Sequence, residues 1–185
     1  MENKACFDTL IEAALDLGAD RAAVIEAGAV ATDTCFRDMC AANHCGRYGT
    51  CYMCPPDVGE IDELMQSLTK YAHVLVYQIV FPLEDSFDFE GMQEARKKHA
   101  KLSQGLRRRL DASVLPNALH LGVGACGVCP TCAKQTGEPC RFPDRAMASL
   151  EAYGINVSAL AKAAGMNYIN GQNTVTYFGA IFFGE

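Results

Sequence analysis

Two cysteine-rich loops constrain this chain more than any other feature of its sequence. They span residues 31–59 and 125–143, contain several glycines and prolines, and lack the apolar periodicity of a helix or strand. Nine of the ten cysteines lie in them, and Cys6 stands apart near the N-terminus. The first loop contains Cys35, Cys40, Cys45, Cys51 and Cys54, and the second contains Cys126, Cys129, Cys132 and Cys140. In a reducing compartment, thiols clustered in this way indicate metal or redox chemistry rather than structural disulfides.

The overall composition favours a globular cytoplasmic protein. The chain has 185 residues, of which half are hydrophobic and 21% are charged, so we expect a single metal-binding domain over residues 1–185. It contains no run of 18 apolar residues, which predicts that it has no transmembrane helix. Its first residues also lack the basic and apolar regions of a secretory signal. The net charge of −6 gives no reason to expect nucleic acid as a partner.

The second loop has the more regular cysteine spacing, C-x2-C-x2-C-x7-C. Cys126, Cys129 and Cys132 match the first three ligands of the bacterial ferredoxin motif, which binds a [4Fe–4S] cluster. The interval before Cys140 is longer than in ferredoxins, and Arg141 follows it where the motif has proline. Zinc sites more often use two separate C-x2-C pairs, so zinc is the alternative metal here. The spacing therefore favours iron–sulfur over zinc.

The first loop is less regular, and five cysteines compete for what we expect to be four ligand positions. Cys40, Cys45 and Cys54 are the favoured ligands, and either Cys51 or Cys35 is the fourth. The step from Cys54 to a proline is again similar to the ferredoxin motif.

Two residues between these cysteines are candidates for tuning a bound cluster. Arg47 and Tyr48 are predicted to donate hydrogen bonds to its sulfur atoms. His44 is the one histidine that we consider as an alternative ligand, because it neighbours Cys45. The other histidines are expected to be structural, and His99 is expected to face solvent.

Helical and strand patterns alternate along the chain, which favours an α/β fold. The nearly continuous apolar run at 73–81 is typical of a strand buried on both faces of a parallel sheet. We therefore predict a single layered domain with a largely parallel or mixed sheet of about four strands. Helices are expected at 3–18, 60–71, 88–112, 144–153 and 157–164, and strands at 22–30, 73–81, 118–124 and 174–183.

The predicted fold brings the two cysteine loops together at one edge of the sheet. The first loop follows the strand at 22–30, and the second follows the strand at 118–124. If these strands run parallel, both loops leave the carboxyl edge, where α/β sheets gather their ligands. The expected result is two neighbouring metal sites in one crevice.

Positive charge is concentrated in the predicted helix at 88–112. Residues 96–109 contain seven of the sixteen lysines and arginines and no acidic residue. This segment could dock an acidic redox partner protein or a phosphate-bearing ligand. The alternative that we favour is a solvated face of an amphipathic helix.

Both cysteine motifs, in this order, resemble an uncharacterised family of predicted metal-binding proteins from bacteria and archaea. The residues that carry the resemblance are Cys40, Cys45, Tyr48, Gly49, Cys54, Pro55 and Pro56, then Cys126, Cys129, Cys132, Cys140, Arg141 and Pro143. It extends over residues 35–165 and implies metal binding, with iron–sulfur favoured, but no particular reaction. The family pattern has three cysteines in the first loop, so Cys35 and Cys51 are additional here. A site with three ligands would leave one iron open to substrate.

The sequence thus predicts an iron–sulfur protein with one or two [4Fe–4S] clusters, acting in electron transfer or a redox step. The alternatives are a zinc-binding structural or interaction module without catalysis, and a protein for metal sensing or delivery. Known motifs for nucleotide binding, serine hydrolysis and zinc proteases are missing from the sequence.

Overall fold

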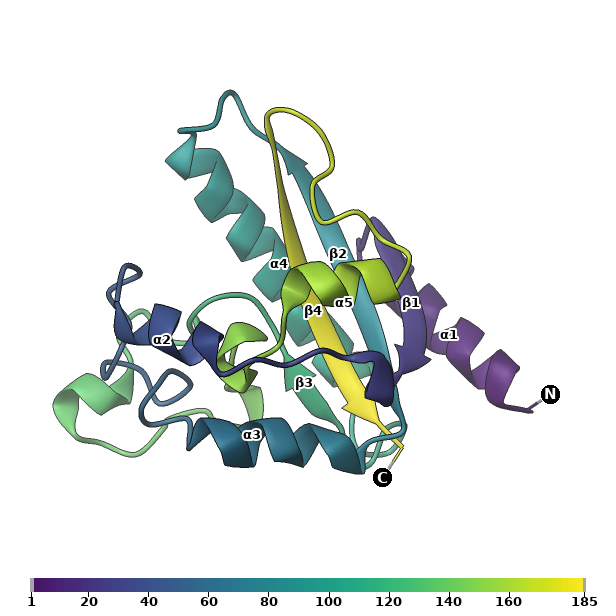
Figure 1. Ribbon diagram of the computed structural model, residues 1–185, viewed down its shortest axis with the longest axis horizontal. Helices are drawn as coiled ribbons and strands as arrows, with labels where there is room; N and C mark the ends of the chain where they lie inside the picture. The colour runs from purple at the N-terminus through teal and green to yellow at the C-terminus, as the bar shows by residue number, and fades with distance from the viewer. Residues whose placement is uncertain (1, 185) are drawn as a thin grey trace.

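The computed structural model describes residues 2–184, and its framework is one four-stranded sheet (Figure 1). The strands are β1 (Arg21–Glu26), β2 (His73–Pro82), β3 (Leu119–Leu121) and β4 (Thr174–Phe183). The helices are α1 (Glu2–Asp16), α2 (Cys35–Ala41), α3 (Ile61–Ser67), α4 (Phe89–Arg109) and α5 (Val157–Ala163). None of the helices in this part of the chain is long and apolar enough to cross a membrane.

The sheet is entirely antiparallel, so the prediction of a parallel or mixed sheet was wrong. Its strand order is β1-β2-β4-β3, and each neighbouring pair is antiparallel. Strands β2 and β3 do point the same way, as expected for two strands joined by the helix α4. They are not neighbours, however, because β4 lies between them and pairs with both. The β-α-β pattern was therefore present, but a strand from the end of the chain separates its two strands.

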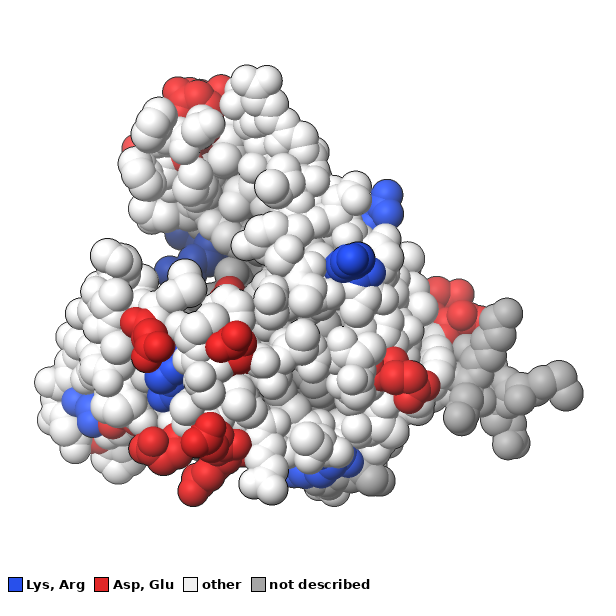
Figure 2. All heavy atoms as spheres, viewed as in Figure 1, with Lys and Arg blue, Asp and Glu red and all other residues white. Residues whose placement is uncertain are grey.

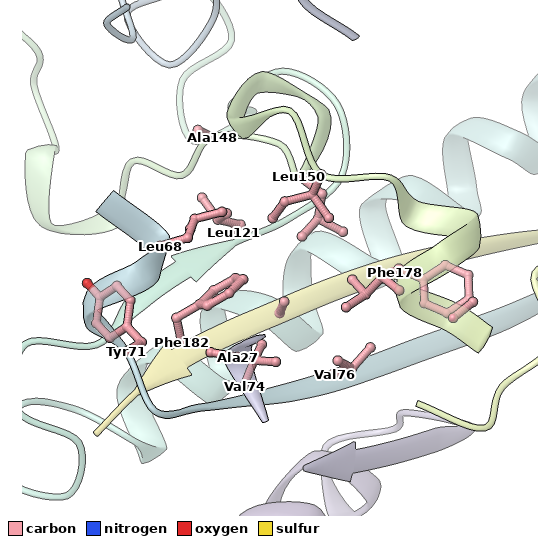
Figure 3. Packing of buried hydrophobic residues seen from close by; sticks show 14 of the residues in the cluster. Ala27, Leu68, Tyr71, Val74, Val76, Leu121, Ala148, Leu150, Phe178 and Phe182 are labelled. Atoms are coloured by element: carbon pink, nitrogen blue, oxygen red, sulfur yellow. The ribbon is translucent and has the colours of Figure 1, made fainter. Parts of the chain in front are cut away.

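Strand β2 is apolar along its length because both faces of the sheet are covered. Helices α1 and α4 pack on one face, against Leu75 and Tyr77 of β2. Helix α5 and the irregular segment before it pack on the other face, against Val76 of β2 and Phe178 of β4. Figure 3 shows this second cluster, with side chains of β2 and β4 meeting the segment around Leu150. Burial on both faces, rather than parallel pairing, explains the apolar run.

The helix predicted at 144–153 is also absent. Two short 3₁₀ turns, Pro143–Arg145 and Glu151–Tyr153, stand at its ends. Between them the chain is extended and pairs with Gly122, whose N–H donates to the Ala148 carbonyl at 2.9 Å. Tertiary pairing thus overrides the local helical pattern of this alanine-rich segment. The same contact anchors the return of the second cysteine loop to the end of β3.

Candidate metal centre

The two cysteine loops meet, although for a different reason from the one predicted. Strands β1 and β3 point in opposite directions, so their carboxyl ends do not share an edge. Instead, the chain entering the first loop pairs with the chain that follows the second loop. Thr32 forms an isolated bridge with Ile155, and the Asp33 N–H donates to the Gly154 carbonyl at 2.7 Å. This pairing brings the first loop beside the second.

Contacts between the loops hold this arrangement. The Tyr52 hydroxyl of the first loop donates to the carbonyl of Glu138 at 2.8 Å, and Lys134 forms an ion pair with Asp57. In Figure 1 the loop around α2 and the second loop lie side by side, at the opposite end of the molecule from α1. The metal-binding candidates are therefore concentrated in one lobe.

Helix α4 fixes the ends of the second loop through its arginines. Arg96 donates to the Ala125 carbonyl at 2.6 Å, directly before Cys126. Arg107, which is half-buried, donates to the carbonyl of Ala146 at 2.8 Å. Carbonyl groups in irregular backbone lack the hydrogen-bond donors that a helix or sheet would provide. The guanidinium groups of Arg96 and Arg107 act as donors to two such carbonyls. The second loop is thus positioned by the basic helix.

Five cysteines line one pocket between the loops. Four come from the second loop and one from the first: Cys126, Cys129, Cys132, Cys140 and Cys51. No His, Asp or Glu of the described chain lines this pocket, so its donor atoms for a soft metal are these five thiols and the thioether of Met53. Thiolates are the ligands of iron–sulfur clusters and of cysteine-type zinc sites. The chemistry of the pocket fits either.

Cys51 lies between the two groups of cysteines. It is 3% exposed, and its sulfur has hydrogen-bond contacts with the thiols of Cys54 and Cys132. The contact with Cys54 is the main reason that the pKa of Cys51 falls to about 6, with a smaller contribution from the Met53 N–H. The same contact, with burial, raises the pKa of Cys54.

The other cysteines of the first loop lie outside this pocket lining. Cys40 is half-buried, and burial together with the negative charge of Glu151 raises its thiol pKa. Cys40 and Cys45 are close enough to Cys54 to raise its pKa further. Cys35 is exposed at the start of α2, and a hydrogen bond with Asp33 raises its pKa. Which of these cysteines bind metal stays a prediction.

The residues around the sulfurs differ in part from those predicted. Arg47 borders a larger cavity next to the cysteine pocket, whereas Tyr48 is 36% exposed and its N–H donates to Asn43. Arg141 was not predicted as a donor, yet its guanidinium has a hydrogen-bond contact with Cys129. The position of Arg141 directly after Cys140 is the sequence feature from which this contact could have been predicted. Hydrogen bonds from Arg47 and Tyr48 to a bound cluster stay predictions, and His44 is exposed.

All ten cysteines are free thiols, which agrees with the expectation against structural disulfides. Among residues 2–184, no three His, Cys, Asp or Glu side chains converge on one point in the way that a single metal ion requires. The five thiols of the pocket instead border it from several sides.

Fold and site together define a cysteine-rich α/β protein with a thiol-lined pocket between two loops. The chain belongs to the family described as predicted metal-binding protein (DUF2284), whose sequence profile matches residues 23–183. The resemblance seen in the cysteine motifs is thereby confirmed. Neither a curated protein nor a solved structure matches the chain. The family description names neither the metal nor the role of the protein.

Proposed function

We propose that the cysteine loops bind an iron–sulfur cluster and that the protein acts in electron transfer or in a redox step. The observation that carries this proposal is the pocket that five thiols line. Four thiolates hold a [4Fe–4S] cluster, and the second loop supplies four. The first loop adds Cys40, Cys45 and Cys54 nearby, with Cys51 between the groups. These thiols are enough for one cluster at the second loop and for a second cluster at the first loop.

The surrounding residues have distinct parts in such a site. Arg96 and Arg107 fix the backbone on either side of the ligands, which limits rearrangement when charge changes. The Arg141 guanidinium beside Cys129 offers an N–H and a positive charge to a ligand sulfur. Hydrogen bonds of this kind favour the more negative, reduced state and so raise the reduction potential. A bound cluster supplies one-electron redox chemistry.

Zinc is the second candidate, and one observation favours it. The pocket between the thiols has a volume of about 20 Å³, which is room for about one water-sized sphere. A single ion needs less opening of the loops than a four-iron cluster, although the thiols must draw closer together to converge on it. In this case the cysteines would staple the two loops together, and the protein would be a structural or interaction module without catalysis.

Spectroscopy of cysteine variants tests the iron–sulfur proposal. The protein is purified under anaerobic conditions as wild type, as Cys126→Ala and as Cys129→Ala. We expect broad visible absorption and, after reduction, an electron paramagnetic resonance signal in the wild type. Either substitution removes a ligand of the second-loop cluster, which has four cysteines for four positions, and should lower both signals by about half if the first loop holds another cluster, or almost completely if it does not.

The matched control is Cys6→Ala, which removes an exposed thiol on α1 that lies outside both loops. Its spectra should equal those of the wild type. A colourless wild-type protein that keeps zinc through purification would exclude the iron–sulfur proposal and support the zinc module. An unchanged signal in both Cys126→Ala and Cys129→Ala would mean that the second loop does not hold the cluster.

A further inference from the structure

A larger cavity lies next to the cysteine pocket. It has a volume of about 470 Å³, within the range of about 300–1,000 Å³ typical of small-molecule sites. Helix α4 and the second cysteine loop form most of its wall, and Arg47 of the first loop completes it. Cys51, Cys126, Cys129 and Cys132 border both this cavity and the thiol pocket. A molecule bound here would therefore lie directly beside the proposed cluster.

The lining of this cavity is strongly basic. Six cationic side chains border it: Arg47, Arg96, Lys97, Lys101, Arg108 and Arg145. No Asp or Glu among residues 2–184 contributes to the lining. Figure 2 shows Lys and Arg side chains at the back of a recess between the α4 end of the molecule and the lobe that contains α2. Cations gathered in a concave, partly apolar site create a positive potential that attracts anions.

The basic segment 96–109 is therefore divided between two roles. Four of its seven cations border the cavity, and three of these, Lys97, Lys101 and Arg108, are exposed, which is compatible with the solvated face that the sequence favoured. The remaining three are engaged elsewhere. Lys98 lies over the ring of Phe81, Arg107 donates to a loop carbonyl, and Arg109 pairs with Asp16.

A buried histidine also forms part of the wall of this cavity. His99 lines the cavity but is only 1% exposed, so the prediction that it faces solvent was wrong. Its Nδ1 lies 3.4 Å from the Ser103 hydroxyl, whereas its Nε2 has no hydrogen-bond partner within the described residues. Burial lowers the pKa of His99 to about 4, so the ring is neutral at pH 7. A buried polar atom without a partner is costly, and a neutral ring keeps that cost smaller than a charged one would.

We infer that this cavity binds a small molecule with several anionic oxygens, either carboxylate or phosphate. The exposed cations of α4 supply most of the attraction, and His99 is part of the wall of the cavity. Arg96 adds its charge from a fixed position, since it also holds the Ala125 carbonyl. The statement that this anion lies beside a redox centre rests on the proposed function. The binding of the anion does not.

Calorimetric titration of the purified protein with inorganic phosphate and, separately, with succinate tests this inference. Both probes are dianions near neutral pH, and they represent the two possible sources of anionic oxygen. We expect saturable binding of at least one probe, weakened by added salt. The triple variant Lys97→Gln, Lys101→Gln, Arg108→Gln changes three exposed side chains and should weaken this binding at least about tenfold.

The matched control removes the same amount of positive charge away from the cavity. It combines Lys98→Gln, Arg109→Gln and Lys162→Gln, none of which borders the cavity. Binding in this control should stay within about twofold of the wild type.

The outcomes separate the inference from the proposed function. Failure of both probes to bind would overturn the inference and leave these cations to neutralise the cluster or to dock an acidic protein. Equal weakening in both triple variants would overturn it as well, since only net charge would then matter. Binding that only the cavity variant loses, in a protein that contains zinc and no sulfide, would refute the redox function and still support the anion site.

Discussion

The hydroxyl of Tyr77 organises a buried polar network, and removing it should cost much of the stability of the sheet. Tyr77 is fully buried, and its oxygen lies 2.7 Å from both the Ser103 hydroxyl and His120 Nε2. Ser103 also donates to the His99 carbonyl, but His120 Nδ1 has no partner in residues 2–184. The substitution Tyr77→Phe would leave the imidazole ring of His120 without a hydrogen bond among the described residues.

The magnitude follows from the two bonds that are lost. A net hydrogen bond contributes about 1 kcal/mol, and a buried polar group left without a partner costs about 1–3 kcal/mol. We therefore expect Tyr77→Phe to lower the free energy of unfolding by about 2–4 kcal/mol. For a domain of this size that corresponds to a fall in Tm of about 5–15 °C.

Denaturant unfolding followed by circular dichroism measures this effect. The matched control is Tyr168→Phe, since Tyr168 is 49% exposed and the change should stay within about 0.5 kcal/mol of the wild type. A loss below about 0.5 kcal/mol in Tyr77→Phe would refute the reasoning. It would show that water or a rotated Ser103 hydroxyl replaces the tyrosine at no cost.

Three further predictions concern acid, packing and metal. Burial lowers the pKa of His99 to about 4 and that of His120 to about 3. Between pH 6.5 and 4, therefore, these two histidines become protonated in the unfolded chain but stay largely neutral in the folded protein. Acidification from pH 7 to 5 should therefore cost about 2 kcal/mol per histidine, and the variant His120→Gln should lose about half of this dependence in denaturant melts. In Gly179→Ala the new Cβ would lie 2.2 Å from the Tyr77 ring, so this variant should lose about 3 kcal/mol or fail to accumulate as folded protein, as judged by circular dichroism. If metal links the two loops as proposed, its removal by a chelator should lower Tm in differential scanning calorimetry. An unchanged Tm would mean that metal does not stabilise the loops.

Much of the fold was predictable, because local patterns decide the elements. The apolar run of β2 and the amphipathic stripe of α4 are present nearly at their expected bounds. The direction of the strands was not predictable in the same way. Strand β4 follows the other strands in the sequence but lies between β2 and β3 in the sheet. The local sequence patterns of β2 and β3 do not indicate that another strand separates them.

The meeting of the two cysteine loops was predicted, but the mechanism was not. It depends on backbone pairing of Thr32 with Ile155, two residues that have no distinctive character of their own. The position of Cys51 in the second-loop pocket was equally hidden, since its spacing assigned it to the first loop. His99 was misjudged because it sits among cations, whereas the helix turns its ring inward onto Tyr77.

The content of metal and acid-labile sulfide per chain, measured after anaerobic purification, tests the central claim most directly. If the loops hold [4Fe–4S] clusters, we expect about four irons and about four sulfides per chain for one cluster, or about eight of each for two. One or two zinc ions per chain with no sulfide would contradict it, and the cysteine loops would then be structural staples.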